Sequence, residues 1–447
     1  MARIELPTAH DPILLDLPEQ WNIQQIAEPK LASAQADWPE RIASALSQPG
    51  NGQGLSRLIQ ARRGGRFVIV VEDITRHSPL VPILEVIARE LEHGKVADSQ
   101  VEILFATGMH HKMTAKQARE KIGPFADRFN WRSNPWTEPQ AYSSIGRAGR
   151  IELQLDTRLV QADLRIIISS VSPHLQAGFG GGAQMLLPGC ASLESIRHLH
   201  RLGLGRNLRQ MVGTDAGANL MRATIDRAGQ LLEKAGGKTL SIQYVLDSDN
   251  QPTSIAVGDL LAVQQMLAKH CAVSCGVVVH EPADIVIAGA FPRDYDLWQS
   301  FKCIPNTMWA LRPGGVLICV TDCPAGRNGI QPPKWPLSPR WTRNLVGWLG
   351  GETLASLIGR LVPRLAGDAA FFVRMGMQTI ERNPVIFLSP RLSQEGDFPG
   401  VTLCDTMERA AEACHDILGT GPQRVTVFPQ GGVTYPIPQR PGRNSAT

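Results

Sequence analysis

The residues best suited to acid–base chemistry are two histidines, His110 and His174, each of which follows an apolar run in this chain of 447 residues. An imidazole changes its charge near neutral pH, so it can accept a proton in one step and return it in another. A single histidine is more often structural than catalytic, and position alone leaves both interpretations open. Their shared placement after strand-like residues makes them candidates for one site.

Polar residues that suit an anionic ligand also follow apolar runs. The segment DITR supplies Asp73, Thr75 and Arg76 after one such run, and Gln299 and Lys302 follow a later one. Asp73 or Thr75 can simply cap the next helix, while Arg76 remains able to reach a ligand. These strand ends thus deliver polar or titratable groups to positions where a ligand of an α/β sheet would bind.

A glycine-rich stretch, GFGGGAQ at 178–184, follows His174 and formally contains the dinucleotide fingerprint G-x-G-x-x-A. Its context is poor, because the glycines do not directly follow a strand and a Pro-Gly pair interrupts the helix that should come next. No acidic residue stands where a ribose would need it, so an ordinary NAD site is disfavoured. Backbone N–H groups at Gly180 and Gly181 can still cradle a phosphate.

Metal-binding patterns are weak. The eight cysteines form no Cys-x-x-Cys pair and lie in apolar surroundings, which predicts reduced, buried thiols rather than a zinc site. His198 and His200 are separated by one residue, and this spacing points their side chains apart on a helix. One histidine can still complete the coordination of a metal that an organic cofactor holds.

The elements that must position these residues follow an α/β pattern. Short apolar runs at 66–72, 100–108 and 164–170 alternate with segments of helical periodicity, and the alternation restarts near residue 283. It predicts two doubly wound, Rossmann-like, mostly parallel sheets. Ligands bind such sheets beyond the carboxyl ends of the strands, so the three early strands are expected to deliver their polar residues to one edge.

Length and composition set the broad class. The chain is too long for one ordinary core, and a boundary near 257–282 divides it into an N-terminal domain at 1–270 and a C-terminal domain at 271–447. The net charge is +4, without a long Lys/Arg block. No signal-peptide pattern and no apolar run near ~20 residues is present. We therefore expect a cytoplasmic protein that binds neither nucleic acid nor membrane.

Five motifs in this order resemble the lactate racemase family: DITRHSP, ATGMHH, PHLQAGFGGGAQMLLPG, ESIRHLH and WQSFK. Members of that family use a nickel-pincer nucleotide, a pyridinium mononucleotide whose two sulfur-bearing arms grip nickel. The resemblance implies that the active site lies in the cleft between the two domains, with the cofactor and the catalytic histidines on the N-terminal one. It also implies dependence on cofactor biosynthesis proteins.

The resemblance implies a role for each matching residue. His110 and His174 would act as alternate acid and base, and His200 would bind nickel. Gln299 and Lys302 would bind the substrate carboxylate together with Arg76. The residues implied to contact the cofactor, besides His200, are Asp73, Ile74, Thr75, Arg76, Gly180, Gly181 and Gln184.

The reaction implied is racemisation or epimerisation of a 2-hydroxy acid by proton-coupled hydride transfer. Lactate or another short aliphatic acid is the first expectation, and malate or a sugar acid of the gluconate type is an alternative. A nicotinamide-dependent 2-hydroxy acid dehydrogenase and a protein that only carries the cofactor are alternatives of other classes.

Two positions depart from the family pattern. Gln184 stands where some members carry a lysine that is joined covalently to the cofactor. Glutamine cannot form that bond, which predicts a noncovalently held cofactor. His111 stands where an arginine is common, so its contact with phosphate or substrate is left open.

Overall fold

The computed structural model describes residues 2–8, 10–50, 52–203, 209–327, 337–361, 370–395, 398 and 400–438. Contacts divide the chain into two compact units, each built on a six-stranded sheet. Unit 2 comprises Leu31–Gly203 and Thr214–Ala272, and unit 1 comprises Met1–Lys30, Leu204–Gly213 and Val273–Thr447. The segment Met1–Lys30, which the sequence places with 1–270, therefore folds with the C-terminal part of the chain.

The sheet of unit 2 is parallel except at one edge, as predicted. Its strands, in spatial order, are β13 (Pro252–Gly258), β12 (Lys238–Leu246), β9 (Leu164–Ser170), β4 (Phe67–Val71), β5 (Val101–Phe105) and β6 (Asn130–Ser133), and only β13 runs antiparallel. Because β9, β4 and β5 are neighbours, their carboxyl ends lie side by side. The predicted convergence of the three early strand ends is thus confirmed.

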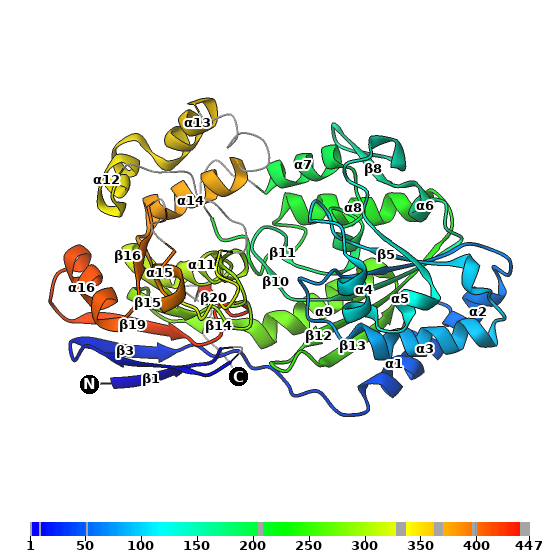
Figure 1. Cartoon of the computed structure of the whole chain (residues 1–447), viewed down its shortest axis with the longest axis horizontal. Helices are drawn as coiled ribbons and strands as arrows, with labels where there is room; N and C mark the ends of the chain where they lie inside the picture. The colour runs from blue at the N-terminus through cyan, green and yellow to red at the C-terminus, as the bar shows by residue number, and fades with distance from the viewer. Residues whose placement is uncertain are drawn as a thin grey trace, which may run out of the picture. The chain divides into compact units, whose positions relative to one another are not determined.

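Both faces of this sheet are covered, which is why every residue of β4 is buried. Phe67, Ile69 and Val71 belong to one apolar cluster, and Val68 and Val70 belong to another. The first cluster contains residues of α1 (Trp38–Ser47), α2 (Leu55–Gln60), α3 (Leu80–His93) and α4 (Ala115–Ile122). The second contains residues of α7 (Leu193–Leu202), α8 (Leu220–Lys234), β7 (Tyr142–Ala148) and β8 (Ile151–Asp156). Figure 1 shows α3 and α8 on opposite sides of the sheet.

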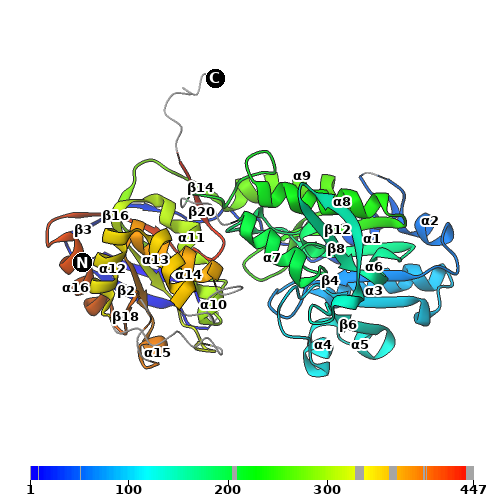
Figure 2. The same ribbon diagram turned by 90° about the horizontal axis from the view of Figure 1, so that it is seen from above.

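Unit 1 repeats the architecture with an entirely parallel sheet. Its spatial order is β18 (Thr402–Cys404), β17 (Val385–Leu388), β16 (Leu311–Val320), β15 (Ala283–Gly289), β19 (Gln423–Phe428) and β3 (Trp21–Ile26). The hairpin β1 (Ala2–Leu6)–β2 (Ile13–Leu17) and α16 (Met407–Leu418) pack on one face. Helices α12 (Pro339–Leu349), α13 (Gly351–Leu361) and α14 (Ala370–Arg382) lie next to one another (Figure 2).

The segment from Leu297 to Ala310 does not form one continuous helix but is divided into α10 (Leu297–Ser300), α11 (Cys303–Thr307) and the 3-10 turn η4 (Met308–Ala310). Pro305 has no N–H to donate and cannot continue a helix that began at Leu297. The remaining helix of several turns is α9 (Leu260–Cys275), and the remaining short elements are α5 (Phe125–Arg128), α6 (Thr157–Val160), α15 (Pro390–Ser393), β10 (Pro173–His174), β11 (Gly178–Phe179), β14 (Gly276–Val279), β20 (Tyr435–Pro438), η1 (Asp98–Gln100), η2 (Pro139–Ala141) and η3 (Gly182–Met185). In the described ranges no helix is long and apolar enough to cross a membrane.

Candidate active site

The DITR segment begins two residues after β4 and is organised by the buried carboxylate of Asp73. Its Oδ1 accepts hydrogen bonds from the Thr75 N–H at 3.0 Å and the Thr75 hydroxyl at 2.6 Å. Its Oδ2 lies 2.7 Å from Nδ1 of His110, which follows the neighbouring strand β5. Arg76 Nη1 in turn donates to the Thr75 hydroxyl at 3.3 Å. The Asp73 carboxylate therefore both stabilises the turn and contacts His110, a candidate catalytic residue.

Electrostatics fix the direction of the Asp73–His110 hydrogen bond. Burial alone would raise the pKa of Asp73, but the hydrogen bond from His110 and the charges of His110 and Arg76 hold it well below its usual range. The ionised carboxylate can only accept, so Nδ1 of His110 donates. Nε2 then carries the lone pair in the neutral ring. Because the His110 side chain is 52% exposed, this nitrogen can act as a base toward a ligand.

The buried side chains of Glu72 and Lys121 hold the DITR loop and its neighbours through hydrogen bonds. Glu72 accepts hydrogen bonds from the N–H and the hydroxyl of Ser170 at 2.9 and 2.7 Å, and from the hydroxyl of Ser78. Lys121 donates to the carbonyl oxygens of Arg76 and Ser78 at 2.5 and 3.1 Å. Burial lowers the pKa of Lys121. These contacts fix the backbone from which Arg76 extends.

The loop that carries His110 is held by residues 133–138, which comprise the last residue of β6 and the five residues after it. Asn134 is fully buried, and its Nδ2 donates to the Gly108 and Ala191 carbonyls at 3.0 Å each. The Trp136 indole donates to the carbonyl of His110 itself at 3.1 Å. The Met113 N–H donates to the Ser133 hydroxyl at 2.8 Å. We call residues 133–138 the clamp segment.

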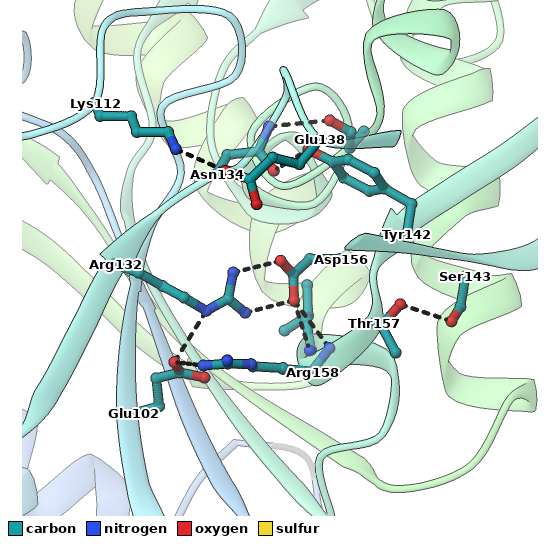
Figure 3. Close-up of polar contacts among 12 residues, drawn as sticks. Glu102, Lys112, Arg132, Asn134, Glu138, Tyr142, Ser143, Asp156, Thr157 and Arg158 are labelled. Carbon is teal, nitrogen blue, oxygen red and sulfur yellow. Dashed lines mark hydrogen bonds and ion pairs between the residues drawn. The ribbon is translucent and has the colours of Figure 1, made fainter. Parts of the chain in front are cut away.

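Other side chains hold the clamp segment in place (Figure 3). The Tyr142 hydroxyl, whose pKa burial raises, donates to Asn134 Oδ1 at 3.0 Å. At the start of the segment, Arg132 pairs with Asp156 at 2.5 Å and with Glu102 at 2.9 Å. A partly buried network therefore connects the sheet and the β7–β8 hairpin to the His110 loop.

His174 lies on the short hairpin formed by β10 and β11. Its Nδ1 accepts hydrogen bonds from the backbone N–H groups of Gln176 at 3.3 Å and Ala177 at 3.0 Å. Helix α8 holds the hairpin, because Asn219 donates to the Gln176 carbonyl at 2.8 Å and Arg222 to the Phe179 carbonyl at 3.3 Å. Nδ1 of His174 thus accepts hydrogen bonds, whereas Nδ1 of His110 donates one.

The glycine-rich stretch is required first by the packing of the chain itself. A Cβ at Gly178 would lie 1.8 Å from the Thr214 carbonyl oxygen, and one at Gly181 would lie 2.7 Å from that of Ser170. Both residues also have positive φ values, of 76° and 78°. At Gly180 a Cβ would meet only the Gln184 Oε1 closely, at 3.2 Å. Cofactor contacts of Gly180, Gly181 and Gln184 stay a prediction.

His200 lies in the last turn of α7 and is half-buried, as is Gln184. The described residues contain no group of three or more His, Cys, Asp or Glu side chains that could hold a metal ion. An imidazole is a suitable nickel ligand, but a single imidazole cannot complete the coordination of a metal ion. A metal at His200 would need its other ligands from a cofactor.

Gln299 and Lys302 lie in unit 1, whereas the other site residues lie in unit 2. Lys302 Nζ donates to Gln299 Oε1, and the Asp296 carboxylate accepts from the Gln299 N–H at 2.7 Å. The structure therefore unites Asp73, Thr75, Arg76 and His110 in one network, and Gln299 with Lys302 in another. The predicted cleft between domains stays a prediction.

Three buried polar residues that support the site, Glu72, Lys121 and Asn134, were not identified from the sequence. Glu72 directly precedes Asp73, and a carboxylate at the end of an apolar strand was an available signal. Lys121 and Asn134 gave none, because the carbonyl groups to which they donate lie 43 or more and 26 or more positions away along the chain.

Comparisons with known proteins agree with these observations. A family model described as the lactate racemase N-terminal domain matches residues 9–211. The chain is 27% identical to a lactate racemase of Thermoanaerobacterium thermosaccharolyticum over 75% of this chain and 78% of that protein. It is 25% identical to a lactate racemase of Lactiplantibacillus plantarum over 65% of this chain and 67% of that one.

Solved structures show the same fold. The lactate racemase apoprotein of T. thermosaccharolyticum superposes with a TM-score of 0.79 at 21% identity, over 98% of this chain and 100% of that one. A protein from Thermotoga maritima gives a TM-score of 0.63 at 17% identity, over 93% and 100%.

Proposed function

We propose that this chain, which is similar to lactate racemases over most of its length and so is an isomerase of the racemase type, inverts the configuration of a 2-hydroxy acid. The observation that carries the proposal is the Asp73–His110 pair, joined at 2.7 Å beside Arg76. It combines an oriented base with an anion-binding guanidinium at the carboxyl edge of a parallel sheet, which is where such folds bind ligands.

The cofactor in this proposal is a nickel-pincer nucleotide. The donor set fits it, since His200 offers one imidazole and the described residues offer no competing metal cluster. Ile74, Thr75, Arg76, Gln184 and His200 are all partly exposed, so a ligand can reach their side chains. When bound, the cofactor would supply a reversible hydride acceptor. Asp73 to Arg76, Gly180, Gly181, Gln184 and His200 would hold it.

The residues of the chain would then divide the work. Arg76, Gln299 and Lys302 would bind the substrate carboxylate, the arginine through a bidentate fork. His110 would take the hydroxyl proton at Nε2, and the charge formed on its ring would be stabilised by Asp73. His174 would serve the opposite side of the substrate, because the two enantiomers direct their hydroxyl groups to different sides.

The substrate in this proposal is lactate or another short aliphatic 2-hydroxy acid. The test uses holoprotein from a host that makes the cofactor and a panel of single-enantiomer acids that includes malate and gluconate. Chiral chromatography should show inversion of a short acid, whereas inversion of malate or gluconate alone would move the substrate to those classes. A complete lack of inversion across the panel would remove the racemase proposal.

Histidine variants distinguish an enzyme from a protein that only binds the cofactor, because inversion and nickel content can be measured separately. His110→Ala and His174→Ala should abolish inversion and leave the nickel content unchanged, whereas His200→Ala should lower the nickel content itself. A protein that only carries the cofactor would have no inversion to lose. A dehydrogenase would instead reduce added NAD in the presence of substrate and accumulate a 2-keto acid.

Noncovalent retention of the cofactor is the remaining part of the proposal. The intact mass of denatured wild-type protein should equal that of the bare chain. Gln184→Lys restores the lysine seen in some relatives, and it should give a fraction of protein with an added cofactor mass. A cofactor adduct on residue 184 of the wild-type protein would contradict noncovalent binding.

A further inference from the structure

We propose that His110 and His174 rest in opposite tautomers, so that Nε2 of His110 accepts hydrogen bonds while Nε2 of His174 donates one. The assignment itself stands on local geometry. Only its catalytic consequence rests on the proposed racemase function.

At His110 the tautomer follows from the partner of Nδ1. The Asp73 carboxylate lies 2.7 Å from that nitrogen and holds only acceptor lone pairs. Flipping the ring would place a carbon against the carboxylate and lose the bond. The neutral ring therefore carries its proton on Nδ1, and its lone pair is on Nε2.

At His174 the partners of Nδ1 are donors. Backbone N–H groups of Gln176 and Ala177 point at that nitrogen at 3.3 and 3.0 Å, so it supplies the lone pair. The neutral ring must then carry its proton on Nε2. Protonating Nδ1 as well would set an N–H against two N–H groups, so a charged ring requires the turn at 174–177 to open.

The hairpin is built in a way that keeps this turn closed. The carbonyl of Gln176 is held by Asn219 at 2.8 Å, and Asn219 is 1% exposed. Gly178 closes the turn so tightly against Thr214 that no side chain fits there. Backbone N–H groups thus make Nε2 of His174 a hydrogen-bond donor, whereas the Asp73 carboxylate makes Nε2 of His110 an acceptor.

In the resting site, the two histidines would therefore favour different groups on the ligand. A substrate hydroxyl that faces His110 meets a base that can accept its proton at once. An oxygen that faces His174 meets an N–H, which suits a carbonyl or alkoxide acceptor. Accepting a hydroxyl proton at His174 requires its Nε2 proton to leave first and the turn at 174–177 to rearrange.

Nuclear magnetic resonance of histidine-labelled protein tests the assignment directly. Two-bond ¹H–¹⁵N correlations reveal which ring nitrogen carries the proton, at a pH about two units above the usual histidine pKa of about 6.5. The expected result is a proton on Nδ1 of His110 and on Nε2 of His174. His110→Gln and His174→Gln identify the signals, and contact between the Ala177 amide proton and the His174 ring identifies them in wild-type protein if a variant does not fold.

The outcomes are separable from those of the activity assay, since the measurement needs neither cofactor nor substrate. A proton on the same nitrogen of both rings would overturn the proposal, even in an active racemase. Asp73→Asn offers an internal check, because an amide can also donate to Nδ1. It should shift the His110 signals and leave those of His174 unchanged.

Discussion

At the scale of single residues, the Asp73 carboxylate decides what His110 can do. Asp73→Asn keeps the shape of the side chain but offers an amide that no longer fixes the Nδ1 proton. We expect kcat for inversion to fall by about 10²- to 10⁴-fold, the range that general acid–base catalysis supplies. The rate is expressed per bound nickel, because Asp73 is also one of the residues proposed to hold the cofactor. Asp127→Asn, at an exposed carboxylate paired with Arg119, is the matched control and should retain full activity.

The same carboxylate links stability to pH. Its pKa is depressed in the folded protein, so its contribution to stability is present above the unfolded pKa of about 4 and is lost as the pH falls through the folded pKa. The difference in unfolding free energy between wild type and Asp73→Asn should therefore shrink on acidification below about pH 4. Urea titrations at several pH values measure it. A difference that grows on acidification would contradict the ionised state of Asp73.

At the scale of elements, the clamp segment positions the His110 loop without touching the reacting atoms. Asn134→Ala leaves the Gly108 and Ala191 carbonyls without their buried donor, at a cost of about 1–3 kcal/mol in stability. We also expect kcat to fall at temperatures where the variant is fully folded, while KM changes little. A lower kcat with an unchanged KM would show that Asn134 positions His110. A variant that is only less stable would keep its full kcat at temperatures where it is folded.

A matched control lies in the same pair of segments. Lys112 and Glu138 form an ion pair at 2.8 Å between the His110 loop and the clamp segment, but both side chains are about half exposed. Such pairs contribute about 0–1 kcal/mol. Lys112→Ala should therefore change neither stability nor kcat measurably, and a loss equal to that of Asn134→Ala would remove the special role of the buried amide.

The sequence predicts these elements well where one strong local pattern controls them. The apolar runs that became β4, β5 and β9 had to be central parallel strands, because only burial on both faces suits them. Position after a strand then identified Asp73, Arg76 and His110. The clamp segment could not be found this way, since Asn134 acts on backbone carbonyls that no side-chain pattern reveals. The glycines were interpreted as ligand-facing, yet Gly178 and Gly181 are required by contacts within the chain.

At the scale of the whole molecule, the two ends of the chain belong to one unit. Strand β3 pairs with β19, and Trp21, which is 3% exposed, packs in the core of that sheet. Trp21→Ala should destabilise by about 3–5 kcal/mol. Hydrogen exchange should rise in β19 and much less in β4. Equal increases in both strands would contradict the division into units.

Cofactor retention is also a property of the whole molecule, because a ligand that binds only the folded state stabilises all of it. Without a covalent bond at Gln184, occupancy depends on free cofactor, and a concentration of 100 times Kd adds about 2.7 kcal/mol of stability. We expect the melting temperature and the nickel content of wild-type holoprotein to fall together during extended dialysis. Gln184→Lys protein with a cofactor adduct should resist both losses. A wild-type protein that keeps its nickel and its melting temperature through dialysis would show that residue 184 does not control retention.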